Sequence, residues 1–586
     1  MKAGDGGWGE RCTLSPVQKV CRNSWCQASF EVTPDDLAFY EKMGSSALEL
    51  RDVPPPTRCP NCRQQRRLVR RNERSYHKRP CSLCRREMLS MYPADAPFPV
   101  YCSTCWWSDK WHPLTYGYDI DFSHPFLEQF LELQNTVPRI TLYGKNNENC
   151  EYINHSVNSK NCYLCVDVAQ TQDTYFSKWM IDCHDCSDCY QLEKSELCCE
   201  SQYSVDLNRS IYAVLCDKSS NLAFCYDCEG CQDCLLCSHL RHKHFCIQNK
   251  QLTVEEYRMR RAEFDLASTG TFQSLLAEYF DLWKSTFHRE QRIIASEDCS
   301  GDFIYHCRNV HHSFGVIESR DCAYCYDAGH MSDCQDAYEP AFNCELQYDA
   351  HGCNGGKRLL ACHICYDNDS LAYCDFCHNS SHLFGCIGLK RQQYCILNKQ
   401  YEKSEYETLV PKIIDHMRKD GPALNQSEVT GSWGEFFPVA LSPFAYNDTL
   451  AQEYFPLSKE EAAKRGLRWR DQIDEVPKVD RIIPAERLPD SIDDIPDDVL
   501  NWAIRCEVTK RPFRIVKQEL AFYRKIRIPI PRLHPDERHR RRMAFTNPRT
   551  LWLHACQRCQ QPIQTTYAPD RPETVYCEQC YLKTVY

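Results

Sequence analysis

The middle of the chain carries short apolar groups at nearly regular intervals. Triplets that contain an aromatic residue or a cysteine recur, mostly every 9 to 15 residues, at 161–163, 174–176, 188–190, 210–212 and 222–224. Asn, Asp, Ser and Gly, which favour turns, separate these triplets. The pattern predicts very short strands stacked as the rungs of a small β-solenoid, in which each rung buries its side chains against the next.

Longer amphipathic segments begin where the triplets stop. The sequences VEEYRMRRAEF and FQSLLAEYFDLW follow Gln251, and SEYETLVPKIIDHMRK follows Gln400. Their apolar residues recur at helical spacing. We expect these helices to cap the stacked strands, because an uncovered sheet edge invites aggregation. Further along, Ser458 and Glu461 predict a capping box before a short helix that stops at Gly466.

The central region contains two copies of one pattern. Residues 237–251 (CSHLRHKHFCIQNKQ) match residues 386–400 (CIGLKRQQYCILNKQ) at a shift of 149. At the same shift Cys216 meets Cys365 and Cys225 meets Cys374. The sequence therefore predicts a tandem repeat across the middle of the chain.

Four cysteines recur at identical spacing near both ends of the chain. Each set has two Cys-x-x-Cys pairs separated by 17 residues, formed by Cys81, Cys84, Cys102 and Cys105 and by Cys556, Cys559, Cys577 and Cys580. Four soft thiolates in two such pairs are the ligands of a structural, tetrahedral zinc ion. These two zinc ribbons are the most specific chemical prediction that the sequence makes.

The similarity between the two ends extends upstream of the ribbons. In the first copy, Cys21 and Cys26 precede a short strand and a helix over 34–42 with Thr33 as its cap. Cys59 and Cys62 then complete a third zinc site and begin a basic helix. In the second copy Cys506 remains, but His534 and Glu537 replace the last two thiols. We expect this fourth site to be degenerate, with zinc bound by Cys506, His534 and His539 as the alternative.

Residues 19–74 resemble the treble-clef zinc-ribbon family, through Phe39-Tyr40 before a Pro-rich loop and the Cys-Pro-x-Cys-Arg motif at 59–63. Nearly the whole chain resembles Cys-rich, multi-zinc proteins of uncultivated bacterial lineages. That resemblance rests on the same motif followed by Arg-Asn-Glu-Arg at 71–74 and Tyr-Cys-x-x-Cys-Trp-Trp at 101–107. It supports the zinc assignment and implies no activity.

A stripe of arginines follows the third zinc site. The spacing predicts one helix face that carries Arg63, Arg66, Arg67, Arg70, Arg71 and Arg74, and the second copy keeps Arg538, Arg541 and Arg542. Such a stripe needs anions. Phosphates of a nucleic acid are one interpretation. Carboxylates of the acidic region 151–375, or solvent alone, are the other.

The central cysteines also allow two interpretations. Free cysteine is compact and often buried, so stacked thiols can form a reduced core without metal. The alternative is zinc or an iron–sulfur cluster at Cys225, Cys228, Cys231, Cys234 and Cys237, which follow one another at three-residue intervals. Ser380 and Leu383 replace two of these thiols in the second repeat, so a ligand role would not be common to both repeats.

Familiar catalytic motifs are missing from the sequence. It contains no phosphate-binding loop, dinucleotide fingerprint, nucleophile elbow or His-Glu-x-x-His motif. This absence favours a binding protein over an enzyme. A metal-dependent enzyme that uses the central cysteines or the cluster of His239, His242 and His244 stays open as the alternative.

Composition adds the expected compartment and domain count. Despite 42 cysteines, the first residues lack the apolar core of a signal peptide, so we expect reduced thiols and a cytoplasmic protein. No stretch approaches the roughly 18 to 20 apolar residues that cross a bilayer. The net charge of -10 conceals basic segments near both ends.

With 586 residues we expect a multidomain chain, in which small zinc modules at both ends flank a Cys-rich, mainly β repeat with capping helices. The predicted parts are a treble-clef-like module (1–76), a zinc ribbon with a helical extension (77–149), two repeat units (150–298 and 299–420), a Pro-rich acidic connector (421–500) and a degenerate treble clef plus zinc ribbon (501–586). The predicted function is a non-catalytic binding scaffold for nucleic acid or protein, held by about three structural zinc ions.

Overall fold

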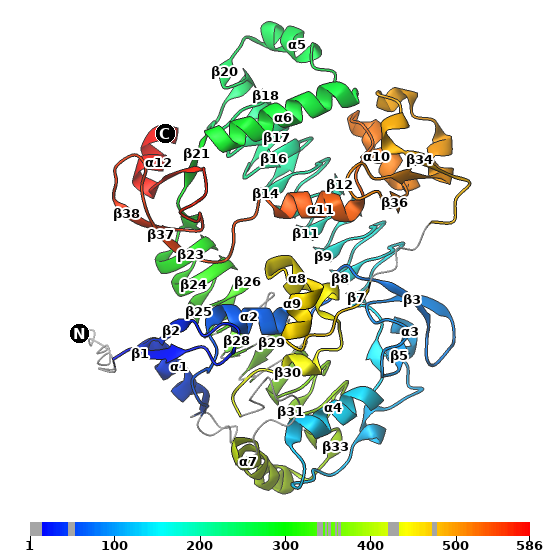
Figure 1. Ribbon diagram of the computed structural model, residues 1–586, viewed down its shortest axis with the longest axis vertical. Coiled ribbons are helices and arrows are strands. Elements are labelled where there is room, and N and C mark those ends of the chain that lie inside the picture. The colour runs from blue at the N-terminus through cyan, green and yellow to red at the C-terminus, as the bar shows by residue number, and fades with distance from the viewer. Residues whose placement is uncertain are drawn as a thin grey trace, which may run out of the picture. The chain divides into compact units, whose positions relative to one another are not determined.

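The computed structural model of the protein describes residues 15–44, 53–333, 335–336, 344–345, 348–349, 353–357, 360, 365–419, 433–471 and 477–586. The chain forms two compact units, and each unit joins two segments that are distant in the sequence. The first unit combines Met1–Thr141 with Arg292–Arg470, and the second combines Leu142–Gln291 with Asp471–Tyr586. Each end of the chain therefore shares a unit with one half of the central region. Both units are mainly β (Figure 1).

The second unit is built on a twelve-stranded sheet. Its main path follows the chain through β7 (Gly144–Lys145), β8 (Asn154–Val157), β9 (Val166–Ala169), β11 (Lys178–Ile181), β13 (Tyr190–Glu193), β14 (Gln202–Val205), β16 (Ile211–Val214), β17 (Ser219–Tyr226), β18 (Gln232–Leu235), β19 (His244–Ile247) and β20 (Lys250–Gln251). β15 (Leu207–Asn208) also pairs with β17, and β10 (Gln172–Tyr175) pairs with β12 (His184–Ser187).

The first unit contains a second twelve-stranded sheet. Its path runs through β22 (Ile293–Ile294), β23 (Glu297–Tyr305), β24 (Arg308–Ile317), β25 (Arg320–Ala323), β27 (Met331–Ser332), β28 (Cys344–Glu345), β29 (Cys353–Lys357), β30 (Cys365–Ala372), β31 (Ser381–Phe384), β32 (Gln393–Ile396) and β33 (Lys399–Gln400). β26 (Tyr326–Gly329) pairs with β24. The two predicted copies of the central pattern thus correspond to two sheets of equal strand number.

Strand pairing follows a 12-residue register throughout the parallel part of the second unit's sheet and at most pairs of the first unit's sheet, where Glu297 with Arg308 is 11 apart and Met331 with Cys344 is 13 apart. Neighbouring strands are mostly parallel, and residues 12 apart lie side by side, as Val166, Lys178 and Tyr190 do. In β7–β19 a left-handed backbone conformation recurs at almost every third residue, for example at Asn158 and Asn161. Asn and Asp tolerate this conformation better than other non-glycine residues. This backbone explains why the region is rich in both.

From β8 to β18, the residue after nearly every left-handed position is buried between the strands. In the second unit this interior contains thirteen buried cysteines together with Val, Leu, Met and Ala. A smaller set of buried cysteines occupies the same kind of position in the first unit. The compact thiol side chain fits an interior with little width between opposite strands.

The helices predicted after each repeat are confirmed. α5 (Val254–Ala262) and α6 (Thr269–Ser285) follow the sheet of the second unit, and α7 (Lys403–Lys419) follows that of the first. α6 packs against β17 (Figure 1), and α7 packs against β32. The capping box of α9 (Lys459–Lys464) is also confirmed, because Ser458 and Glu461 exchange both hydrogen bonds.

The N-terminal segment supplies two hairpins and short helices to the first unit. β1 (Val17–Val20) and β2 (Ser29–Val32) form the first hairpin, and α1 (Pro34–Gly44) and α2 (Pro60–Leu68) follow it. The Thr33 hydroxyl accepts a 3.1 Å hydrogen bond from the Asp36 amide, so the predicted cap is confirmed. The second hairpin is β3 (His77–Pro80) with β4 (Glu87–Ser90), followed by β5 (Val100–Tyr101), α3 (Ser103–Trp106), α4 (Phe126–Thr136) and β6 (Arg139–Ile140).

The connector and the C-terminal segment complete the two units. α8 (Leu450–Tyr454) belongs to the first unit, where the connector buries Trp433, Phe436 and Phe437. The second unit takes β34 (Arg481–Pro484), β35 (Trp502–Arg505), β36 (Pro512–Phe513), α10 (Lys517–Ile526), α11 (Pro535–Met543), β37 (Trp552–Ala555), β38 (Pro562–Thr565), β39 (Thr574–Tyr576) and α12 (Glu578–Val585). β21 (Phe287–Arg289) pairs with β39. In the described ranges no helix combines the length and apolarity that a membrane span requires.

Candidate metal centres

Three groups of four cysteines bring their sulfur atoms together. Within each group all four Sγ atoms lie within 4.8 Å of one another, in Cys21, Cys26, Cys59 and Cys62, in Cys81, Cys84, Cys102 and Cys105, and in Cys556, Cys559, Cys577 and Cys580. A zinc ion with Zn–S bonds of about 2.3 Å needs sulfurs about 3.8 Å apart. The Sγ–Sγ distances of 3.7 Å between Cys26 and Cys59, 3.9 Å between Cys84 and Cys102 and 3.7 Å between Cys559 and Cys577 fit that tetrahedron. All three groups could hold a metal ion, and four thiolates are consistent with zinc.

The two ribbon sites have the same construction. The first Cys-x-x-Cys pair lies in the tight turn of a hairpin, where Arg85 or Gln560 adopts a left-handed conformation. The second pair begins a helix, α3 or α12. The amide of the third cysteine donates to the first sulfur, at 3.3 Å from Cys102 and at 3.2 Å from Cys577. Local backbone geometry therefore places the four sulfurs of each ribbon site close together.

Backbone N–H groups also favour the thiolate form of the first ligand in each ribbon. Burial of Cys81 opposes ionisation, but amides of Cys102, Cys84 and Leu83 outweigh it and lower the pKa of this thiol to about 6. The same arrangement lowers the pKa of Cys556 to about 6. A thiolate is the form that ligates a metal.

The third site joins the β1–β2 turn to the start of α2. The Cys21 amide donates a hydrogen bond to Ala28 O at 2.8 Å across this turn. Gln27, within the turn, adopts a left-handed conformation. Cys59 is the N-cap of α2 and Cys62 lies in its first turn. The ligand set predicted for the first module is thus assembled in the structure.

The fourth site keeps its turn but not its ligand set. The Cys506 amide donates to Arg511 O at 3.0 Å, and Lys510 is left-handed, as in the three complete sites. His534 takes the N-cap position of α11, where its Nδ1 accepts the Asp536 amide at 3.1 Å. Among the described residues, the groups of three or more converging ligands are the three tetracysteine groups alone, so Cys506, His534 and His539 do not form one. The turn has survived the loss of the metal ligands.

The central thiols point at backbone carbonyls rather than at a common centre. Cys225 Sγ lies 3.5 Å from Ala223 O and 3.6 Å from Cys234 O, and Cys228 Sγ lies 3.5 Å from Tyr226 O and 3.8 Å from Cys237 O. Cys231, Cys234 and Cys237 make the same contact with the carbonyl two residues before them. These contacts fit thiols packed in a reduced core.

The predicted arginine stripe is buried and paired within the first unit, but α2 ends at Leu68, so Arg70, Arg71 and Arg74 lie beyond the helix rather than on one helix face. Arg63 Nε lies 2.6 Å from Asp336, Arg66 contacts Asp349 at 2.8 Å and Glu435 at 2.7 Å, Arg67 pairs with Asp336 and Asp349, Arg70 contacts Asp375 at 3.3 Å, and Arg71 contacts Glu73 at 2.5 Å. At most 3% of any of these five side chains is exposed. A polyanion in solution cannot reach them. Internal pairing therefore replaces the polyanion interpretation for Arg63, Arg66, Arg67, Arg70 and Arg71.

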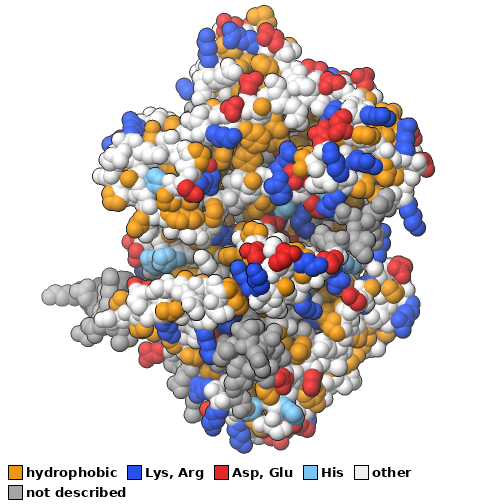
Figure 2. All heavy atoms as spheres, in the orientation of Figure 1, with side chains coloured by type: hydrophobic (Ala, Val, Ile, Leu, Met, Phe, Trp, Pro, Cys, Tyr) orange, Lys and Arg blue, Asp and Glu red, His pale blue; other side chains and the backbone are white. Residues whose placement is uncertain are grey.

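The second unit repeats this arrangement on α11. Arg538 contacts Asp188 at 2.5 Å, and Arg542 contacts Asp188 at 2.6 Å and Glu200 at 3.1 Å. Both arginines are buried, so the polyanion interpretation is corrected for them as well. Arg541 is exposed beside Glu537, and Arg74 is half-buried. Figure 2 shows basic and acidic side chains interspersed over the visible face rather than gathered into one basic patch.

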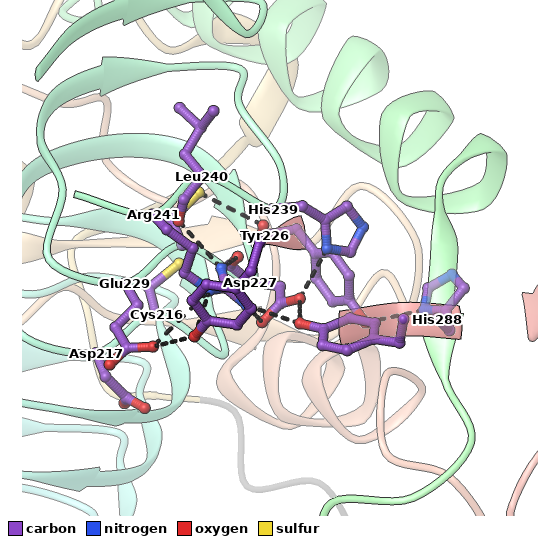
Figure 3. Close-up of polar contacts among 12 residues, drawn as sticks. Cys216, Asp217, Tyr226, Asp227, Glu229, His239, Leu240, Arg241 and His288 are labelled. Carbon is purple, nitrogen blue, oxygen red and sulfur yellow. Dashed lines mark hydrogen bonds and ion pairs between the residues drawn. The ribbon is translucent and has the colours of Figure 1, made fainter. Parts of the chain in front are cut away.

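A further contact joins the segment of each ribbon site, 81–111 or 556–586, to the sheet of its unit. In the second unit Tyr581 of α12 donates to Asp227, and Arg241 lies 3.2 Å from the same carboxylate and 5.5 Å from the Tyr586 ring centre. Figure 3 shows Asp227, His239 and Arg241 converging at this point. His239 uses both ring nitrogens, towards Asp227 at 2.7 Å and Thr286 at 2.9 Å, which leaves neither nitrogen to bind metal or substrate.

The equivalent contact in the first unit uses a lysine and tryptophans. Lys390 Nζ lies 3.8 Å from the Trp106 ring centre and 4.9 Å from that of Trp111. Lys390 matches Arg241 at the repeat shift of 149, and the two tryptophans match Tyr581 and Tyr586 at the end-module shift of 475. Sequence reasoning missed this contact, although combining the two shifts would have pointed to it.

The carboxylates that receive the arginines were also missed. Asp188, Asp336, Asp349 and Glu435 are buried and Glu200 is half-buried, and nothing in their local sequence separates them from the many exposed acidic residues nearby. Burial of Glu435 disfavours its charge, but Arg66 and Arg58 outweigh burial and hold its pKa well below the usual range.

In comparisons with known proteins, no family model matches the chain and no curated protein matches it.

Proposed function

We propose that the protein is a non-catalytic binding scaffold in which structural zinc fastens small treble-clef and ribbon modules to two β-solenoids. The 12-residue register and the left-handed residue at every third position support a solenoid of four short sides per turn. The position of Cys59 and Cys62 at the start of α2 supports a treble clef. Structural zinc contributes on the order of 10 to 16 kcal/mol in small modules, enough to order segments with little core of their own.

The observation that carries this proposal is the combination of convergent thiols with buried docking contacts. Each complete ribbon begins a helix whose aromatic residues contact a cation of the neighbouring sheet. A metal placed in this position holds a module against a rigid surface. The partner class favoured by the geometry is protein, since the arginines that suggested nucleic acid are occupied internally.

The test is metal removal followed by limited proteolysis. We expect excess chelator under reducing conditions to expose cleavage sites within 15–105 and 551–586, while the central sheets stay resistant. If the end modules resist protease equally well after mass spectrometry has shown that the zinc is gone, the fastening role is wrong.

The enzyme alternative makes a different prediction for the same sample. An iron–sulfur or catalytic zinc centre among the central thiols would add iron, visible absorption or a fourth zinc ion to the purified protein. The proposal requires colourless protein, because thiols that donate to backbone carbonyls are not metal ligands.

A further inference from the structure

An open groove runs across the sheet of the first unit. It has a volume of about 950 Å³ and is lined by residues 295–297, 306–308, 318–320 and 330–332. These four segments are successive turns of the chain, brought side by side by the parallel pairing of β23, β24, β25 and β27. The groove is therefore a feature of the repeat itself and not of a single loop.

One ladder of paired residues crosses the groove. Glu297 pairs in register with Arg308, Arg308 with Arg320, and Arg320 with Ser332. Neighbouring strands lie about 4.8 Å apart, so the two arginines project from adjacent backbone positions. Both side chains are exposed. The ladder thus places two guanidinium groups next to each other on a rigid surface.

These two arginines differ from those of α2 and α11 in having no partner within the described part of the chain. No hydrogen bond or ion pair of either side chain occurs there, whereas Arg63, Arg67 and Arg542 each contact a carboxylate. Like charges on directly opposite residues of adjacent strands are unfavourable. An anion between Arg308 and Arg320 would remove that repulsion and accept hydrogen bonds from both guanidinium groups.

A second column of side chains borders the ladder. His306, Glu318 and His330 occupy the left-handed position of three successive turns. His330 Nδ1 lies 3.0 Å from Glu318 Oε2, so this carboxylate is engaged by histidine and does not neutralise the arginines. His306 is exposed at the same edge of the groove. Within the described part of the chain, neither Glu297 nor Glu318 forms an ion pair with Arg308 or Arg320.

We propose that this groove binds an anionic side chain of a protein partner, a carboxylate or a phosphorylated residue, between Arg308 and Arg320. The inference rests on the scaffold function and names the chemistry of its partner. Glu297 lies next to Arg308 in the ladder and Glu318 lies in the neighbouring column, and both would repel a continuous run of phosphates. A single anionic group on a polypeptide fits between them, and a nucleic-acid backbone does not.

The test uses the full-length, zinc-loaded protein and two short peptides of equal length, one with four glutamates and one with a single phosphoserine. Calorimetric titration distinguishes the two sources of the anion. We expect at least one peptide to bind, and the double substitution Arg308→Gln with Arg320→Gln to weaken that binding at least tenfold. The matched control, Arg209→Gln with Arg391→Gln, changes two exposed arginines outside the groove and should leave affinity unchanged.

Thermal melting provides a readout that does not need a known partner. Arg320→Gln should raise the melting midpoint by about one degree in peptide-free buffer, because it removes one of two adjacent like charges. The same variant should lose the rise that the binding peptide produces in the unchanged protein. An ordinary surface arginine would show neither effect.

Two results would overturn the proposal that the groove binds an anionic side chain. One is equal peptide affinity in the double variant and the unchanged protein, or no peptide binding by either. The other is tighter binding of a single-stranded oligonucleotide than of both peptides. If these occur while the protein still holds three zinc ions and unfolds at its ends on chelation, the groove inference fails and the scaffold proposal stands.

Discussion

Neighbouring arginines on α11 differ sharply in environment. Arg542 is buried against Asp188 and Glu200, while Arg541, the preceding residue, lies on the surface beside Glu537. Removing one member of a buried ion pair leaves an uncompensated charge, whereas exposed pairs contribute little. The pair therefore offers a comparison in which helix propensity and sequence neighbourhood are nearly constant.

We expect Arg542→Ala to lower the free energy of unfolding by about 3 to 5 kcal/mol. Arg541→Ala should lower it by no more than about 1 kcal/mol. Urea unfolding followed by circular dichroism, with zinc present throughout, measures both. Equal effects of the two substitutions would show that the buried network does not hold α11 to the sheet.

The same network predicts a pH dependence. Burial, with the nearby charge of Asp188, raises the pKa of Glu519 to about 7, although Arg538 opposes the shift. A carboxyl whose pKa is raised by folding takes up a proton in the folded state. Its contribution is present at low pH and is lost as the pH rises through about 7.

Stability of the second unit should therefore fall between about pH 4.5 and pH 7, by on the order of 1 to 3 kcal/mol for this group. Glu519→Gln mimics the protonated form and should flatten that part of the profile. Thermal melting across this pH range in both proteins provides the measurement. A parallel decline in the two proteins would assign the pH dependence to other groups.

At the scale of elements, buried positions 12 residues apart form columns in the interior of the sheets, and such a position can hold either cysteine or serine. Ser201 lies two turns before Cys225 in the same column, and its hydroxyl donates to Cys199 O at 3.2 Å, as the Cys225 thiol does to Ala223 O at 3.5 Å. The two side chains thus serve the same packing and hydrogen-bonding role. A metal ligand could not be exchanged in this way.

Cys225→Ser should accordingly cost only about 1 to 2 kcal/mol of stability and leave the metal content unchanged. Cys225→Leu adds volume to a packed interior and should be the more damaging change. Denaturant unfolding and metal analysis of each purified variant test this. Loss of a metal ion from Cys225→Ser would restore a ligand role to the central thiols.

The elements were predicted unevenly from the sequence, for physical reasons. Helices α5, α6 and α7 and the three tetracysteine groups depend on local spacing, and the structure has them where the sequence indicated. The 12-residue register was not recognised, although a local signal existed. Cys183, Cys186 and Cys189 are spaced by three, which is the interval between buried positions in this backbone.

At the scale of the whole molecule, each unit combines an end of the chain with one half of the central region. The N-terminal modules share a unit with the second repeat, and the C-terminal modules with the first. Sequence order alone did not indicate this assignment. The contacts responsible, such as Arg67 with Asp349 or Arg538 with Asp188, join residues hundreds of positions apart, and many other carboxylates could have served.

The most direct test of the account is the number and identity of metal ions per chain, measured by mass spectrometry on protein purified under reducing conditions without added metal. The account predicts three zinc ions and no iron, with one ion lost from Cys84→Ser and one from Cys559→Ser. Protein that contains no zinc, or that keeps its full metal content in both variants, would contradict it.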